Sequence, residues 1–241
     1  MTIAQPTGPG ASVVYHEITS QPEVWGATLQ RLQAERDRLG ELLFSQCWDA
    51  IVFTGAGSTH YLSLAAANHF QQLTGTRSHG VPASEIALFA GGVYPDVPSQ
   101  QVLLVPVSRS GETSETLWAV DRHLARRLPV LAVTCNPESA LAGRAQAVFA
   151  APDAREASVP QARAFTSLYL VTQFLAGMAS ADDGYMEALA RLPAAAEALL
   201  QRAQGVATEA ALNDWARVIF LGSGPYYGLA CEAMLKLKEM A

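Results

Sequence analysis

The chain has 241 residues, of which 50% are hydrophobic and 16% are charged. This length predicts one large domain or a domain with part of a second, and a charged fraction below the roughly 25% of an average domain excludes disorder for most of the chain. Sixteen Lys and Arg against twenty-two Asp and Glu give a net charge of −6 without a basic cluster, so nucleic acid is excluded as the expected partner.

Targeting and metal-binding signals are missing from the sequence. The first ten residues carry no basic side chain and no apolar run, so they do not resemble a signal peptide, and the longest apolar stretch, 169–179, is far shorter than the ~18 residues of a membrane span. We expect a cytoplasmic protein that does not bind a membrane. Cys47, Cys135 and Cys231 stand singly, which predicts three small core residues and no metal site.

The first two thirds of the chain alternate between short apolar runs and helical patterns. Residues 1–12 are expected to be a frayed terminus, and leucines at three- and four-residue spacings predict a helix over about 17–46. Strands are predicted at 50–54, 80–83, 101–107, 129–134 and 147–150, with helices at 61–73, 114–127 and about 138–144. This alternation predicts an α/β fold with a doubly wound, flavodoxin-like parallel sheet of five strands in the order 2-1-3-4-5.

The last third is helical over 163–203 and then repeats an earlier pattern. Residues 215–221 read as a strand, 222–228 as a Gly-rich loop and 229–241 as a helix, like the unit at 50–73. One strand and one helix cannot cover both faces of a parallel sheet, so we expect the start of a second domain that is truncated at residue 241. The expected division is a tail and helix at 1–46, a first domain at 47–180, a helical linker at 181–212 and the second domain from 213 to 241.

Two loops carry residue types that suit phosphate binding. Ser108-Arg-Ser-Gly-Glu-Thr-Ser114 follows the strongest predicted strand and opens a helix, and it offers four hydroxyls and a glycine. Such a loop can cradle a phosphate, although a simple helix cap would need only one of these hydroxyls. Gly55-Ala-Gly-Ser-Thr59 is weaker evidence, because a tight turn explains it as well. It lacks the third glycine of the dinucleotide fingerprint, which disfavours NAD.

The strand order adds information to these loops. In the order 2-1-3-4-5 the first and third strands are neighbours, so both loops would face one crevice at the carboxyl ends of the strands, where ligands bind in such sheets. Near the end of the chain, Glu232, Lys236 and Glu239 share one face of a helix. By themselves they read as a solvated ion pair.

Taken together, these motifs resemble the sugar isomerase (SIS) domain family, in particular its double-domain members around the isomerase half of glucosamine-6-phosphate synthase and the amino-sugar-phosphate deaminase/isomerases. The resemblance extends over nearly the whole chain from Glu17. It is carried by 17–22, 55–59, 84–86, 108–116, 134–136, 156–159, 164–166 and 232–239. The serine-rich loop at 108–114 and the Leu-Lys-Leu-Lys-Glu segment at 235–239 are its most specific parts.

The resemblance implies binding of a hexose or hexosamine 6-phosphate, without metal or cofactor, by a homodimer whose sites are completed across the subunit interface. It assigns phosphate binding to Ser58, Thr59, Ser108, Ser110 and Thr113. It also implies weaker substrate contacts at Arg109, Val159 and Gln161. Glu239 would move a proton between the first and second sugar carbons, with Lys236 in the same site. A carboxylate suits this step, because one base must remove the proton and return it to the neighbouring carbon.

Departures from the family pattern narrow the expected reaction. This sequence contains no glutaminase domain with an N-terminal cysteine before the isomerase region, so we expect deamination or isomerisation rather than glutamine-dependent synthesis. Gln161 and Ala162 replace a usual Ser and Thr. The ring-opening His and a later Lys of the family would lie beyond residue 241, so we expect the chain itself to lack turnover. The alternative is a non-catalytic sugar-phosphate-binding regulator, but no basic helical pair typical of such regulators precedes residue 50.

Overall fold

The computed structural model describes residues 9–94 and 101–240 and contains a five-stranded parallel sheet. Its order is β2-β1-β3-β4-β5, as expected from the sequence. The strands are β1 Ala50–Gly55, β2 Ser78–Pro82, β3 Val102–Ser108, β4 Leu131–Thr134 and β5 Ala147–Ala150. The pairing of Thr54 with Pro106 sets the carboxyl ends of β1 and β3 side by side.

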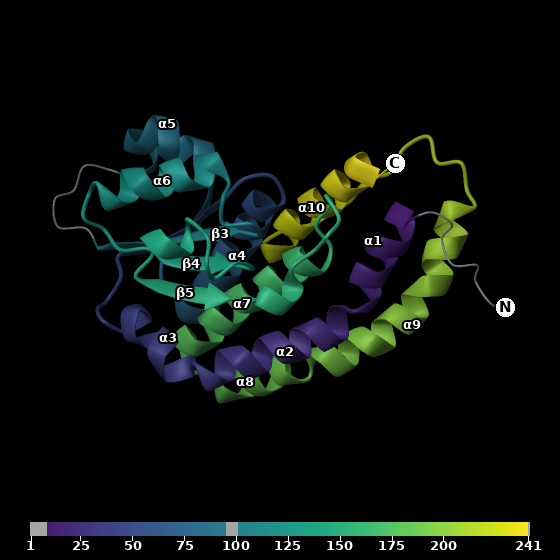
Figure 1. The fold of residues 1–241 in the computed structure, drawn as a ribbon, viewed down its shortest axis with the longest axis horizontal. Helices are drawn as coiled ribbons and strands as arrows, with labels where there is room; N and C mark the ends of the chain where they lie inside the picture. The colour runs from purple at the N-terminus through teal and green to yellow at the C-terminus, as the bar shows by residue number, and fades with distance from the viewer. Residues whose placement is uncertain (1–8, 95–100, 241) are drawn as a thin grey trace.

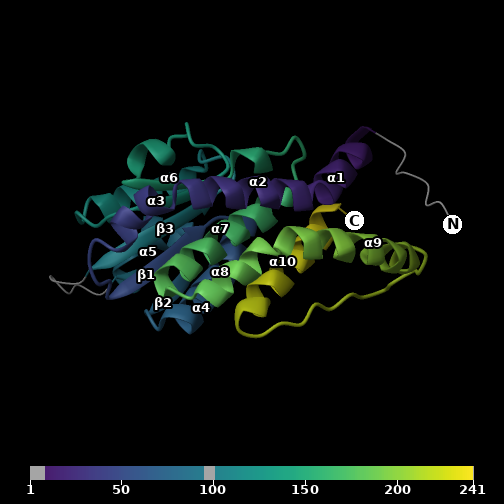
Figure 2. The same ribbon diagram turned by 90° about the horizontal axis from the view of Figure 1, so that it is seen from below.

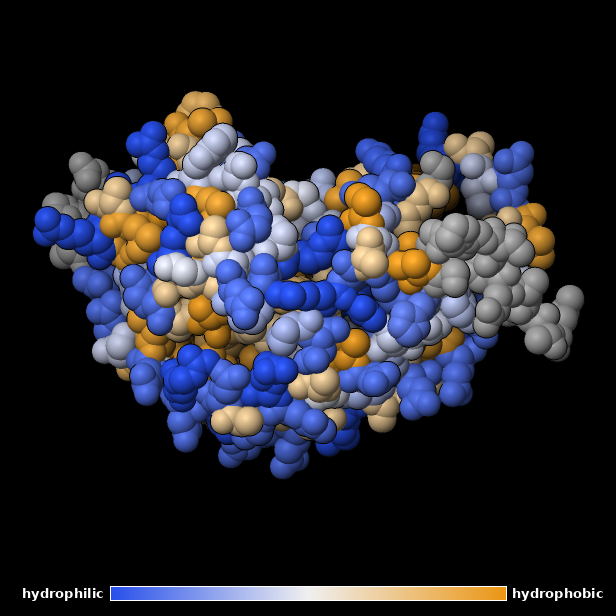
Figure 3. Space-filling model, viewed as in Figure 1, coloured by the Kyte–Doolittle hydropathy of each residue, from blue (hydrophilic) through white to orange (hydrophobic). Residues whose placement is uncertain are grey.

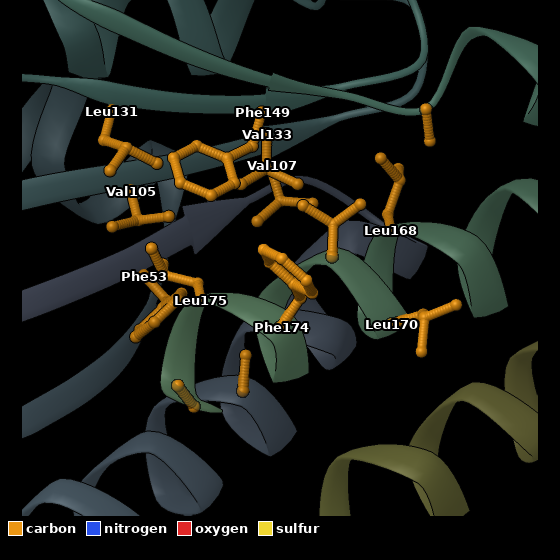
Figure 4. Close-up of a cluster of buried hydrophobic side chains, with 14 of the residues drawn as sticks. Phe53, Val105, Val107, Leu131, Val133, Phe149, Leu168, Leu170, Phe174 and Leu175 are labelled. Atoms are coloured by element: carbon orange, nitrogen blue, oxygen red, sulfur yellow. The ribbon is translucent and has the colours of Figure 1, made fainter. Parts of the chain in front are cut away.

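Helices cover both faces of the sheet (Figure 1). Alternate residues of the central strands point to opposite faces, as strand geometry requires. The strand residues on one face pack against α4 Ser58–Thr74 and α7 Arg163–Ser180. Those on the other face pack against α5 Ala83–Val93 and α6 Ser114–Leu124. Figure 4 shows the first layer, in which Phe53, Val105 and Leu131 of the strands face Leu168, Phe174 and Leu175 of α7.

The N-terminal region differs from the single helix expected over 17–46. It forms α1 Pro9–Thr19, α2 Gln21–Ala34 and α3 Arg36–Leu43. Pro22 explains the first break, because proline is accepted in the first turn of a new helix but not inside a continuing one. Residues 9–12 are helical, so the frayed terminus expected for 1–12 is wrong for them, and residues 1–8 lie outside the described part of the chain.

The C-terminal region consists of α8 Asp183–Ala190, α9 Leu192–Ala211 and α10 Pro225–Met240. Figure 2 shows α9 beside α2. The strand expected at 215–221 is not formed, and Trp215, Ile219 and Leu221 are exposed. A strand needs a neighbour for its backbone N–H and C=O groups, and the described residues pair no strand with this segment. The helix expected near 138–144 is the short 3₁₀ turn η1 Ala142–Arg144, and a second such turn, η2, spans Pro152–Ala154.

The three cysteines have different environments. Cys135 is buried, as expected, and burial raises the pKa of its thiol to about 12. Cys231 is half-buried, and Cys47 is exposed in the connection between α3 and β1. The core position expected for Cys47 is therefore wrong, because the chain leaves the core after Leu43 and returns to it only at β1.

Buried His123 makes the stability of the fold depend on pH. Its Nδ1 lies 3.1 Å from the Tyr94 hydroxyl and its Nε2 lies 3.0 Å from the Pro129 carbonyl, and burial lowers its pKa from 6.5 to about 4. Between these pH values the unfolded chain binds a proton that the folded chain does not, so the free energy of unfolding falls as the pH falls.

We expect His123→Gln to remove this part of the pH dependence, because glutamine keeps a donor and an acceptor but does not titrate. Urea unfolding at about pH 4.5 and about pH 7 measures the change. His79→Gln is the control, because His79 is exposed. An equal pH dependence in the wild-type and His123→Gln chains would contradict the prediction.

Candidate functional site

The two hydroxyl-rich loops lie next to each other at the carboxyl edge of the sheet. Residues 55–59 connect β1 to α4. Residues 108–113, which we call the serine loop, connect β3 to α6. Since β1 and β3 are paired neighbours, the N-termini of α4 and α6 begin at the same edge. Helix N-termini carry unpaired N–H groups and a partial positive charge, which favours an anion there.

The serine loop is held by its own hydroxyl oxygens. Ser108 Oγ accepts the Gly111 N–H at 3.1 Å, and Ser110 Oγ accepts the Glu112 N–H at 3.1 Å. The Ser108 and Thr113 hydroxyl oxygens are 3.4 Å apart. A serine that accepts through its oxygen still has its own proton to donate, so this arrangement leaves the hydroxyls able to bind an anion. Ser108 is buried, Ser110 is exposed, and Thr113 is half-buried at the start of α6.

Gly111 is required by the shape of the serine loop. Its φ is +70°, a conformation that side chains disfavour, and a Cβ there would lie 2.0 Å from Ser139 Oγ. Ser139 is itself buried and belongs to the connection after β4. The close approach therefore fixes the serine loop against that connection, which the sequence did not indicate.

The first loop uses its two hydroxyls differently. Thr59 Oγ1 accepts the Ala56 N–H at 3.1 Å and donates to the Ala56 carbonyl at 3.0 Å, so it closes the turn. Ser58 is buried at the first position of α4, close to the side chain of Glu232 on α10, whose two carboxylate oxygens are buried and accept no hydrogen bond among the described residues. Ser58 and Thr59 were expected to act together on a phosphate. In the structure Ser58 lies beside Glu232, whereas the Thr59 hydroxyl bonds to the backbone of Ala56.

Helix α10 reaches this edge because it packs very closely on α4. A Cβ on Gly228 would lie 2.3 Å from the Tyr61 carbonyl oxygen, so the two backbones touch. Gly224 lies near Asn68, one end of the crossing, and Glu232 lies beside Ser58 at the other. The helices are therefore antiparallel, and the last turns of α10 extend past the N-terminus of α4.

These last turns carry the expected pair of catalytic residues. Lys236 Nζ is 3.3 Å from Glu232 Oε1 and also forms an ion pair with Glu239. Burial, together with the charge of Glu239, raises the pKa of Glu232, although Lys236 and Ser58 act in the opposite direction. The side chain of Glu232 is only 6% exposed and that of Lys236 17%, whereas that of Glu239 is 38% exposed. The solvated ion pair suggested by spacing alone is thus wrong for Glu232.

The three weaker substrate contacts expected from the sequence lie around the loop at 156–162. Arg109 Nη1 lies 3.3 Å from Glu156 Oε2 and donates to the Ser158 and Val159 carbonyls at 3.1 and 3.2 Å. Val159 is 86% exposed, and the Oε1 atom of half-buried Gln161 is buried. The structure therefore brings Arg109 and Val159 together through the loop backbone. Their contact with a substrate stays a prediction.

In the described ranges, 9–94 and 101–240, no cluster of His, Cys, Asp and Glu could hold a metal ion. Within the same residues, no helix combines the length and the apolar character needed to cross a membrane.

A family comparison fits this geometry. The sequence profile of the SIS domain family matches residues 45–179, more than half of the chain. The chain belongs to the SIS domain family. The match begins before β1 and ends in α7, so this SIS domain contains the whole sheet and both hydroxyl-rich loops.

Relatives of known name are longer than this chain. A Streptomyces coelicolor protein, provisionally named a D-galactosamine-6-phosphate deaminase, is 29% identical over 98% of this chain and 63% of its own length. The glutamine–fructose-6-phosphate aminotransferase (isomerizing) of Bordetella parapertussis is 29% identical over 100% of this chain and 41% of its own length. The SIS chain described here thus spans less than two thirds of these relatives.

Solved structures share the fold. Glucosamine-6-phosphate deaminase from Thermotoga maritima superposes with a TM-score of 0.82 at 24% identity, covering 95% of this chain and 67% of that one. Tagatose-6-phosphate ketose/aldose isomerase from Escherichia coli gives a TM-score of 0.83 at 22% identity, covering 98% and 66%. At these identities the likeness concerns the SIS fold.

Proposed function

We propose that this SIS protein binds a hexose or hexosamine 6-phosphate between residues 55–59 and the serine loop. The observation that supports this most is the convergence of two hydroxyl-rich loops and two helix N-termini on neighbouring strands. In the proposal the hydroxyls of Ser108, Ser110 and Thr113 hold the phosphate. Ser58 and Thr59 face it from the first loop, where the Thr59 hydroxyl shapes the turn through its bonds to Ala56. Val159 and Gln161 contact the sugar. No cofactor is needed, and the expected location is the cytoplasm.

The proposed reaction is amino-sugar-phosphate deamination, ketose–aldose isomerisation, or both. Glu239 is the base that moves a proton between the first two sugar carbons, since its carboxylate is the more exposed of the two that flank Lys236. Lys236 forms an ion pair with Glu239 and so holds its carboxylate in place in this site. The names of the two sequence relatives, a deaminase and an isomerizing aminotransferase, support this class of reaction.

We expect Ser110→Ala to weaken binding of glucosamine 6-phosphate by about 1–3 kcal/mol, the range for a hydrogen bond to a charged group. Ser108→Ala combined with Ser110→Ala should lose more. Isothermal titration calorimetry with hexose and hexosamine 6-phosphates measures the effect. Ser45→Ala is the control, because Ser45 is exposed and its hydroxyl donates to the Leu42 carbonyl, away from the loop. Unchanged affinity in the double variant would refute the phosphate assignment.

We further propose that the protein forms a homodimer. Large apolar side chains are exposed on α5 and α6, among them Leu88, Phe89 and Trp118, and Figure 3 shows orange apolar residues at the end of the molecule that carries α5. Contiguous exposed apolar surface is unusual for a monomer. Light scattering at micromolar concentration is expected to give twice the monomer mass, and a stable monomer would contradict the proposal.

A further inference from the structure

The loop at 156–162 is held in place by buried carboxylates. Glu17, at the end of α1, is 2% exposed and accepts the Ala157 and Ser158 N–H groups at 2.7 and 3.2 Å. The Ser158 hydroxyl also donates to Glu17. A buried carboxylate is costly unless hydrogen bonds satisfy it, so these bonds tie α1 firmly to the loop.

Glu156 holds the other end of the same loop. Its side chain is fully buried, and its Oε1 accepts the Ala162 and Ala164 N–H groups at 2.6 and 3.0 Å. These N–H groups open α7, where the local residue, Ala162, has no side chain that could cap the helix. Glu156 therefore acts as a cap from outside the helix and fixes the point at which the loop ends.

Arg109 connects this loop to the serine loop. Its guanidinium bonds to Glu156 Oε2 and to the Ser158 and Val159 carbonyls, while its backbone stands between Ser108 and Ser110. One residue thus belongs to the proposed phosphate site by its backbone and to the 156–162 loop by its side chain. A rigid link of this kind sets the distance between the groups on either side of it.

We propose that Glu17, Arg109 and Glu156 are positioning residues that hold the 156–162 loop at a set distance from the serine loop and so determine how well the sugar part of the substrate is bound. This inference rests on the proposed function, because it assigns the sugar contacts to Val159 and Gln161. It gives Arg109 a role through the loop rather than the direct substrate contact that the resemblance implied. Glu17 and Glu156 receive roles that the family resemblance did not assign.

Ligand binding tests the effect on specificity. In Glu17→Gln the affinity for glucosamine 6-phosphate should fall about tenfold, as for loss of one charge-assisted hydrogen bond, while the affinity for inorganic phosphate stays within about twofold. A purely structural role would change both affinities or neither. Glu35→Gln is the matched control, since Glu35 carries an exposed carboxylate paired with Arg38. Equal losses for the two ligands, or no loss, would overturn the proposal.

Hydrogen exchange tests the link without any ligand. Arg109→Lys should speed exchange at the amides of Ala162 and Ala164 about tenfold, because lysine cannot bond to Glu156 and two carbonyls at once. Unchanged exchange in that variant would refute the link between the loops. If the wild-type chain binds neither glucosamine 6-phosphate nor inorganic phosphate, the proposed function fails, and the exchange result alone then decides whether the loops are coupled.

Discussion

Glu239→Gln is expected to leave glucosamine 6-phosphate bound while lowering proton transfer at the second carbon by about 10²–10⁴, the usual contribution of a general base. The amide keeps the shape of the side chain but cannot accept a proton. Lys236 retains Glu232 as an ion-pair partner at 3.3 Å, so the change should not displace the lysine. Deuterium uptake from heavy water at the second carbon, followed by NMR, measures the step.

We propose that turnover needs a complete second domain, so the assay compares the 241-residue chain with a protein that includes one. Lys238→Gln is the control, since Lys238 is an exposed residue of the same helical turn. Wild-type exchange rates in Glu239→Gln would remove Glu239 from the mechanism. Turnover by the 241-residue chain would instead contradict the predicted two-domain organisation.

The sheet could be predicted because each strand carries its own signal. β1 and β3 are continuous apolar runs that are buried on both faces, and such runs stand out against the helical patterns between them. Chain order and short connections then favour the order 2-1-3-4-5 over most alternatives. The two phosphate-type loops follow from this order, since their positions depend only on which strands are neighbours.

The burial of Glu232 could not be predicted in this way. Spacing along α10 indicates which residues share a face but not what covers that face. Helix α4 packs on that face of α10, and the two helices approach closely only because Gly228 allows backbone contact with Tyr61. Gly228 was expected in a loop at 222–228, whereas it lies inside α10, so its position gave no signal of the close contact with α4.

The contacts of Glu17 and Glu156 also could not be predicted from local patterns. The segment 215–221 shows the opposite case, in which a local pattern predicted a strand that does not form. Glu17 bonds to Ala157, 140 residues further along the chain, so no local pattern reveals the contact. Residues 215–221 have the composition of a buried strand, yet a strand is a property of a pair, and the described residues supply no partner strand. Composition alone therefore could not decide whether this segment forms a strand, and the start of a second domain at 213 stays a prediction.

Gly228→Ala is expected to destabilise the packing of α10 on α4 by about 3 kcal/mol or more, at or beyond the upper end of the usual cost of overpacking. The added Cβ would lie 2.3 Å from the Tyr61 carbonyl oxygen and 2.8 Å from the Ala65 nitrogen. Both are backbone atoms, so no change of rotamer removes the clash. Helix α10 must therefore move away from α4. This movement separates Glu232 from Ser58 and takes Lys236 and Glu239 away from residues 55–59.

The matched control is Gly205→Ala on α9, where nothing lies within 4 Å of the added Cβ. There the same substitution should stabilise the helix by about 0.5–1 kcal/mol, because alanine is the better helix former. Urea unfolding reports the global effect, and hydrogen exchange in α10 reports local detachment even where the rest of the fold is unchanged. Equal protection of α10 in the two variants would show that the contact between Gly228 and α4 does not hold the proposed catalytic residues in place.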